Sequence, residues 1–215
     1  MIVPETPAEL IGEFLPQYFG RLLSEQRSAS SASSKAPQRP LAAAPASVGV
    51  GIRVVGAGEW TLRVVAERLL VEPKIANDVA LQVSLPDQDF RPLVVEPVRR
   101  ALALGASAQG AARSVSGGIW SRLGRWDEET VELLRQQTGG ILLRIQDGER
   151  NRRVALTPSL QPYSLESAEC TIDCALADLQ QLQEKRGNPL DLFYAGQIRI
   201  SGDAQIALAM AGLFL

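Results

Sequence analysis

The chain has 215 residues, of which 46% are hydrophobic, 5% are aromatic and none is histidine. Serine or cysteine hydrolases with an imidazole base, and metal sites built on imidazole, are therefore excluded. The formal net charge of −2 provides no protein-wide basic field, so we expect no nucleic-acid partner.

The first predicted element is an amphipathic helix over 7–26, in which apolar residues recur at helical spacing. Pro16 interrupts this stretch, so we expect a bend or two short helices. Residues 28–47 are rich in Ser, Ala and Pro and are predicted to form a flexible linker. The N-terminus does not resemble a signal peptide, and no apolar run approaches the roughly 20 residues of a membrane span, so we expect neither feature.

Residues 48–85 are rich in β-branched side chains and turn residues, and we interpret them as four antiparallel strands. A helical stretch follows Asp87 and is expected to break at Pro92 and Pro97. The Ala-, Gly- and Ser-rich run 105–118 then indicates a boundary. The chain is therefore predicted to divide into two parts of similar length.

The N-terminal half is assigned to 1–115 and the C-terminal domain to 116–215. Both have the order helix, four strands, helix, which predicts an internal duplication. Gly139 and Gly140 end the first helix of the C-terminal part. The elements predicted there are a helix from Asp127, strands at 141–146 and 152–157 joined by an Asp147–Gly148 turn, a strand at 169–176, a helix at 177–185, a strand at 197–200 and a helix at 203–213.

A glycine-rich motif, Val-Val-Gly-Ala-Gly, stands at 54–58. It permits a dinucleotide-binding interpretation, in which a pyrophosphate sits on a helix N-terminus. Thr61 stands where the third glycine of that fingerprint belongs, and no convincing β-α-β unit follows. A hairpin turn is the favoured interpretation.

Charged residues interrupt several apolar strands, among them Arg144, Arg153 and Asp173. Paired carboxylates can perform acid–base chemistry without histidine. Asp173 and Arg199, however, fall on the faces opposite the apolar rows, which favours a cross-strand ion pair on the solvated side of the sheet. Asp203 is interpreted as the N-cap of the final helix, and Ser201 is the alternative.

A short basic run, Arg150, Arg152 and Arg153, surrounds the second predicted hairpin. We interpret it as a solvated turn, and a weak tether to lipid headgroups is the alternative. Cys170 and Cys174 lie four residues apart in a predicted strand, which separates them by about 13 Å and excludes a disulfide between them. A reducing, cytoplasmic location is expected.

The stretch from Asn188 to Asp203 resembles the sterol carrier protein 2 family. The family pattern is an asparagine-proline turn, a phenylalanine, a glycine-led short strand and a Ser-Gly-Asp-like cap, followed by a helix of Ala, Leu and Met. Upstream, Gly139–Gly140 at the first strand, the Asp147–Gly148 hairpin and the segment 168–172 agree with the same family. The resemblance covers about 127–215.

This resemblance implies an α+β fold, an α/β sandwich with a mainly antiparallel five-stranded sheet covered by helices. Such a domain encloses an apolar tunnel for lipids. Residues 48–93 resemble the first four strands and the following helix of the same fold, without a counterpart of 196–203. The N-terminal half is therefore interpreted as a degenerate repeat, and a composite body in which it covers the second half is the alternative.

The implied function is a non-catalytic carrier of a fatty acyl, sterol or isoprenoid lipid, with no catalytic residue, cofactor or metal. Transient membrane contact and a protein partner are included in this expectation. The alternatives are an accessory module for a lipid or isoprenoid pathway enzyme, as in bacterial pathways, and a simple packed core. The expected ligand-binding residues are Leu143, Ile145, Ile172, Cys174, Leu179, Leu182, Phe193, Ile198, Ile200, Ile206, Met210 and Leu213.

Overall fold

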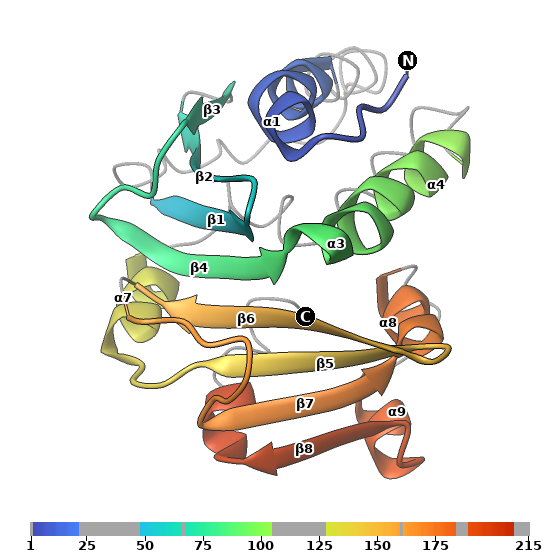
Figure 1. The fold of residues 1–215 in the computed structure, drawn as a ribbon. Helices are drawn as coiled ribbons and strands as arrows, with labels where there is room; N and C mark the ends of the chain where they lie inside the picture. Colours follow the sequence, from blue (N-terminus) through green and yellow to red (C-terminus); the bar gives the residue numbers. More distant parts are fainter. Residues whose placement is uncertain are drawn as a thin grey trace, which may run out of the picture.

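A computed structural model describes residues 2–21, 48–65, 68–104, 128–159, 161–183 and 189–208. Its eight strands form one sheet with the order β3-β2-β1-β4-β6-β5-β7-β8 (Figure 1). The α+β class with a mainly antiparallel sheet is confirmed, but the sheet has eight strands and not five. The predicted linker and the predicted boundary run lie outside the described residues.

The four strands predicted in the N-terminal half are present. They are β1 (Gly49–Val55), β2 (Gly58–Val65), β3 (Arg68–Glu72) and β4 (Val79–Pro86). The expectation that all four are antiparallel is wrong, because β4 pairs with β1 in parallel. β1 and β3 already occupy both edges of β2, so the chain crosses back after β3 and joins the free edge of β1. The alternation of apolar residues along a strand does not encode this direction.

The C-terminal half also contributes four strands. They are β5 (Ile141–Asp147), β6 (Arg150–Pro158), β7 (Cys170–Ala175) and β8 (Ile198–Gly202). β5 and β6 form the predicted hairpin, and Gly148 adopts a φ of 60° in its turn. β7 pairs with β5 in parallel and with β8 antiparallel.

The halves share a hairpin whose first strand also takes a parallel partner, β1-β2-β4 in one half and β5-β6-β7 in the other. β3 has no counterpart among the described C-terminal residues, and β8 has none among the described N-terminal ones. A counterpart of β3 would lie on the outer edge of β6, and a counterpart of β8 would lie on the outer edge of β4. Instead, β4 and β6 pair with each other antiparallel along these edges. Each half therefore completes the sheet of the other, and the internal duplication stays a prediction.

Two N-terminal helical stretches contain prolines without breaking. The first comprises α1 (Pro7–Glu9), the π-helical η1 (Leu10–Phe14) and helix to residue 21, and the second comprises α3 (Asp87–Phe90), η2 (Arg91–Val95) and α4 (Glu96–Leu104). The expected breaks at Pro92 and Pro97 are therefore wrong, and of the two alternatives at Pro16 the one with two separate helices is wrong. In both stretches a π-helical turn ends two residues before a proline, Pro16 or Pro97. The wider turn relieves the clash between a proline ring and the preceding carbonyl groups.

The C-terminal half has the helices α7 (Glu128–Gln136), α8 (Leu176–Gln183) and α9 (Pro189–Tyr194), and residues 204–208 are helical. α9 was not predicted, since its Pro189 was assigned to a turn. Proline is well suited to the first helical position, where its missing N–H has no intrahelical partner to lose. None of the helices in the described part of the chain is long and apolar enough to cross a membrane.

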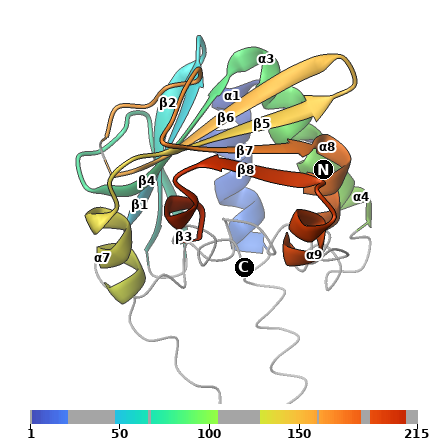
Figure 2. The ribbon, with the colours of Figure 1, turned by 90° about the horizontal axis from the view of Figure 1, so that it is seen from below.

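The sheet presents an apolar face and a polar face. Figure 2 shows α1, α7 and α9 gathered on one side of the curved sheet. In the N-terminal half this side is closely covered, and Leu10, Ile11, Val50, Leu62 and Leu81 are at most 1% exposed. The main N-terminal core therefore lies between η1 and the strands β1, β2 and β4.

Candidate functional site

An apolar surface extends over the strands β5, β7 and β8 of the C-terminal half. The strand register aligns Leu143, Ile172 and Ile200 in one cross-strand row, and Ile145, Cys174 and Ile198 in the next. Side chains in such rows point to the same side of a sheet. We call the half-buried members of these rows the C-terminal apolar face; they are Leu143, Ile172, Cys174, Ile198 and Ile200.

The C-terminal apolar face differs from its N-terminal counterpart in burial. The corresponding strands β1 and β4 contribute Val50, Val54 and Leu81, all at most 1% exposed. The C-terminal side chains remain half-buried although Leu143, Ile172, Cys174 and Ile200 contact the core. Within these strand rows the N-terminal half also has half-buried members, Val64, Val71 and Val83, but the half that resembled a lipid-binding domain has more of them.

The predicted ligand-binding residues outside the C-terminal apolar face differ in how deeply they are buried. Ile145 and Ile206 are buried, Leu179 and Leu182 on α8 are half-buried, and Phe193 on α9 is 44% exposed. α8 contacts β5 and β7, and α9 contacts β8, so both helices border the C-terminal apolar face. Met210 and Leu213 lie outside the described residues.

The pKa of the Cys174 thiol indicates how polar the C-terminal apolar face is. Burial, assisted by the negative charges of Asp178 and Asp173, raises the pKa of its thiol to about 11. Burial likewise raises the pKa of Cys170. Both cysteines are free, as the spacing predicts. The face is therefore an apolar environment with negative charge nearby.

Alkylation of Cys174 is expected to be slow in the native protein. A free thiol has a pKa near 8.5, so at pH 8 the thiolate fraction of Cys174 is lower by roughly a hundredfold or more. In a Cys170→Ser background, iodoacetamide should react at a rate that rises with pH up to about 11. The protein unfolded in urea is the control, and a native rate equal to that of the unfolded protein would contradict the assignment.

A corner of hydrogen bonds fixes the start of the final helix against the sheet. Glu169 accepts the N–H of Gly140 through its carboxylate (2.8 Å) and the N–H of Asp203 through its carbonyl oxygen (2.8 Å). The Gly140 N–H holds the pKa of the Glu169 carboxyl below its ordinary range. Asp203 accepts the N–H of Gln205 at 2.9 Å, which confirms the predicted N-cap.

A buried ion cluster joins the two halves, and the sequence did not reveal it. Arg152 was interpreted as part of a solvated turn, but its side chain is only 8% exposed. Its guanidinium donates to Asp89 of α3 (3.0 Å) and to Asp147 (2.8 Å from Nε), and Asp89 also accepts the backbone N–H of Arg153 (3.2 Å). The prediction of a solvated turn is wrong for Arg152, because the pairing of β4 with β6 places α3, which follows β4, next to this hairpin. Arg150 and Arg153 are exposed.

The polar face carries the predicted cross-strand ion pair with a different partner. Asp173 pairs with Arg144 at 2.8 Å, across the parallel β5–β7 ladder. Arg199 lies opposite Asp173 in the antiparallel ladder, as expected from the strand pattern. Both side chains of the Arg144 pair are well exposed, so it is a solvated pair and not a catalytic constellation.

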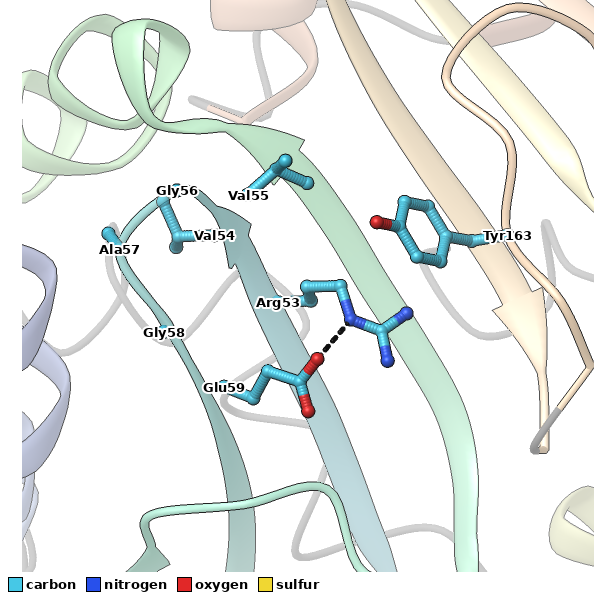
Figure 3. A pocket seen from close by; sticks show the side chains of 8 residues that line it. All are labelled: Arg53, Val54, Val55, Gly56, Ala57, Gly58, Glu59 and Tyr163. Carbon is cyan, nitrogen blue, oxygen red and sulfur yellow. Dashed lines mark hydrogen bonds and ion pairs between the residues drawn. The ribbon is translucent and has the colours of Figure 1, made fainter.

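The glycine motif forms the hairpin turn between β1 and β2. The N–H of Ala57 donates to the carbonyl of Val54, and Gly56 has a φ of 96°. No helix follows, so the dinucleotide-binding interpretation is excluded. A hollow of about 660 Å³ beside this turn is drawn in Figure 3, where the Arg53 guanidinium lies 4.4 Å from the Tyr163 ring and pairs with Glu59. Its lining is mixed and it lies apart from the C-terminal apolar face.

The described residues contain no group of three or more His, Cys, Asp or Glu side chains placed to hold a metal ion. The chemistry available at the C-terminal apolar face is therefore contributed by aliphatic side chains, one protonated thiol and the carboxylates that border it.

Comparisons with known proteins agree with the resemblance found in the sequence. Residues 122–215 match the SCP-2 sterol transfer family. The match covers the C-terminal half, from before α7 to the end of the chain, and confirms the resemblance for that half. No curated protein matches the chain.

Among solved structures, the chain is similar to the palmitated SCP2L2 of Aedes aegypti, with 22% identity, a TM-score of 0.37, and coverage of 48% of this chain and 92% of that one. Sterol carrier protein 2 like 2 of the same organism gives 17% identity, a TM-score of 0.32 and coverages of 54% and 97%. The apo form of sterol carrier protein 2 from Yarrowia lipolytica gives 14%, 0.30, and 57% and 87%.

Proposed function

We propose that the protein is a non-catalytic lipid carrier that holds an apolar molecule on the C-terminal apolar face. The observation that carries the proposal is the coincidence of two findings in one half of the chain. Residues 122–215 match the SCP-2 sterol transfer family, and the same half has the apolar strand rows that remain half-buried. Fatty acyl, sterol and isoprenoid lipids are the proposed ligands.

The mechanism is transfer of hydrocarbon from water to a protein surface of matching polarity. Each methylene that leaves water contributes about 0.8 kcal/mol, so a long chain binds with few hydrogen bonds. Isoleucines dominate the face, with Ile172, Ile198 and Ile200 on adjacent strands. Such a site selects for length and hydrophobicity, which suits a carrier more than an enzyme.

We also propose that the protein acts in the cytoplasm and exchanges its lipid with membranes. Free thiols at Cys170 and Cys174 support a reducing, cytoplasmic compartment. A carrier that acquires lipids there exchanges them with membranes, so transient membrane contact belongs to the same proposal. Vesicles loaded with a pyrene-labelled lipid provide the corresponding transfer assay.

Substitution of Ile172 by glutamate is expected to weaken lipid binding at least tenfold. The side chain lies in the middle of the face, between Leu143 and Ile200, so a carboxylate there introduces an unpaired charge into the site. Titration with 1-hexylpyrene, a hydrocarbon without a headgroup, measures the effect by fluorescence.

Thr171→Glu is the matched control, because Thr171 precedes Ile172 on the same strand and points to the polar face. This variant should bind 1-hexylpyrene like the unchanged protein. If the unchanged protein does not bind the probe, or if both variants lose binding equally, the carrier proposal fails.

An accessory role beside a lipid pathway enzyme is the second candidate function, and one surface feature favours it. Phe193 and Tyr194 of α9 are 44% and 82% exposed and contact each other edge to face. Exposed adjacent aromatic side chains are typical of protein contacts. The change Tyr194→Ser, at the more exposed of the two rings, should then weaken association with a purified partner enzyme and leave 1-hexylpyrene binding unchanged.

A further inference from the structure

Three arginines and one aspartate form a single row across the polar face of the C-terminal half. The strand register places Arg153 of β6 beside Arg144 of β5. Arg144 in turn lies beside Asp173 of β7, and Asp173 lies beside Arg199 of β8. We call these four residues the basic row. Neighbouring strands lie about 4.8 Å apart, so the row extends about 14 Å across the sheet.

The basic row is open to solvent. The three arginines are exposed and Asp173 is half-buried. Strand alternation directs all four side chains away from the C-terminal apolar face. The two neighbouring rows on the same face are uncharged; they consist of Gln146, Asn151 and Ala175 on one side and of Leu142, Ala155, Thr171 and Ser201 on the other. The charge of this sheet surface therefore comes from the basic row.

Only one of the three positive charges is neutralised within the described part of the chain. Asp173 accepts hydrogen bonds from Nε and Nη2 of Arg144, each at 2.8 Å. Arg153 donates to the carbonyl oxygen of Leu165 at 3.1 Å, which orients its guanidinium without neutralising it. Arg199 forms no hydrogen bond or ion pair with a described residue. Three arginines and one aspartate leave the row with a net charge of +2.

Two arginines on the polar face of the N-terminal half are treated differently, because each has its own carboxylate. Arg53 pairs with Glu59 at 2.6 Å, and Arg63 pairs with Glu72 at 3.4 Å and with Asp78. The whole chain has a net charge of −2, so the basic row is a local reversal of sign. Within the described residues, no carboxylate balances the excess charge of the row.

We propose that the basic row is a docking surface for an acidic segment of a partner protein. Guanidinium groups bind carboxylates through two parallel hydrogen bonds, and arginine is enriched in protein interfaces. Asp173 holds Arg144 and a backbone carbonyl holds Arg153, so two of the three guanidiniums are already oriented before the partner binds. The partner places carboxylates opposite Arg153 and Arg199.

The position of the basic row favours a protein partner over an anionic membrane. On β5, β7 and β8, the row and the C-terminal apolar face lie on opposite sides of the same strands. A membrane docked on the row would therefore face away from the surface proposed to hold the lipid. A protein docked there leaves the apolar face open. The carboxylate contacts themselves do not require a bound lipid.

Fluorescein-labelled poly-L-glutamate is the probe, and fluorescence anisotropy measures its binding to the full-length protein. The experiment uses about 0.01 M salt, where the Debye length is about 30 Å. Arg199→Glu should weaken binding by about tenfold or more, the range of one charge-assisted contact. Arg199→Gln removes the charge without reversing it and should have a smaller effect in the same direction.

Arg68→Glu is the matched control. Arg68 is also an exposed arginine without an ion pair in the described chain, but it lies on β3, at the opposite edge of the sheet. The same change of charge there should leave the affinity for poly-L-glutamate unchanged. If the unchanged protein does not bind the probe, or if Arg68→Glu and Arg199→Glu weaken binding equally, the docking surface is wrongly assigned.

Vesicles of phosphatidylserine and phosphatidylcholine test the membrane as the partner. Arg199→Glu should bind them like the unchanged protein. Vesicle binding that Arg199→Glu abolishes would overturn the assignment to a protein partner. The 1-hexylpyrene titration separates this inference from the carrier proposal, because Arg199→Glu alters only the polar face and should leave the affinity for that probe unchanged.

Discussion

Replacement of Arg152 by leucine is expected to lower the free energy of unfolding by about 3–5 kcal/mol. The substitution leaves the Asp89 carboxylate, whose side chain is 5% exposed, without its charged partner. It also removes the ion pair between α3 of the N-terminal half and the β5–β6 hairpin, and leaves the backbone N–H of Arg153 as the donor to Asp89. Urea unfolding followed by far-UV circular dichroism measures the loss.

The control for this prediction is Arg144→Leu, which breaks the solvated pair with Asp173 on the polar face. Since both side chains of that pair are well exposed, the change should cost less than about 1 kcal/mol. Adding Asp89→Leu to Arg152→Leu should recover stability, because no buried charge then remains. A loss below about 1 kcal/mol in the single Arg152 variant would show that Asp89 finds another donor.

Gly202→Ala is expected to detach β8 from the sheet. Gly202 has a φ of 84°, and a Cβ at this residue would clash with the carbonyl oxygen of Glu169. The backbone conformation alone costs about 1–3 kcal/mol for an alanine, and the clash with a backbone atom has to be relieved by moving the strand. Hydrogen exchange should accelerate at the amides of β8 and of Asp203.

Gly196→Ala separates the two causes of that effect. Gly196 also has a positive φ, of 73°, but no atom lies within 4 Å of the position that its Cβ would take. This control should cost only about 1–2 kcal/mol and leave exchange in β8 close to that of the unchanged protein. If the two alanine variants behave alike, the close approach of Gly202 to Glu169 does not determine the position of β8.

Much of the fold could be predicted because strand patterns and turns are local. The alternation at 79–85 and the Asp147–Gly148 turn identified β4 and the β5–β6 hairpin. Long-range pairing was not predictable in the same way. Neither the parallel entry of β4 beside β1 nor its antiparallel contact with β6 leaves a signal in the residues next to each other in the sequence.

The candidate site was predictable in its apolar part and not in its polar part. Ile172, Cys174 and Ile198 stand on one face because the alternation of their strands requires it. Asp89 gave no such signal, since an acidic residue in the first turn of a helix is common for electrostatic reasons alone. The contact of Asp89 with Arg152 follows from the pairing of β4 with β6, which joins residues far apart in the sequence.

The pairing of β4 with β6 also has a consequence for aggregation. Unpaired edges of long strands are templates for association between molecules, and natural sheets limit them by ending in short strands. This pairing places the eight-residue β4 and the nine-residue β6 inside the sheet. The two edges are formed instead by β3 and β8, each of five residues. A chain cut between the halves would expose the longer edges, so each half protects the other from self-association.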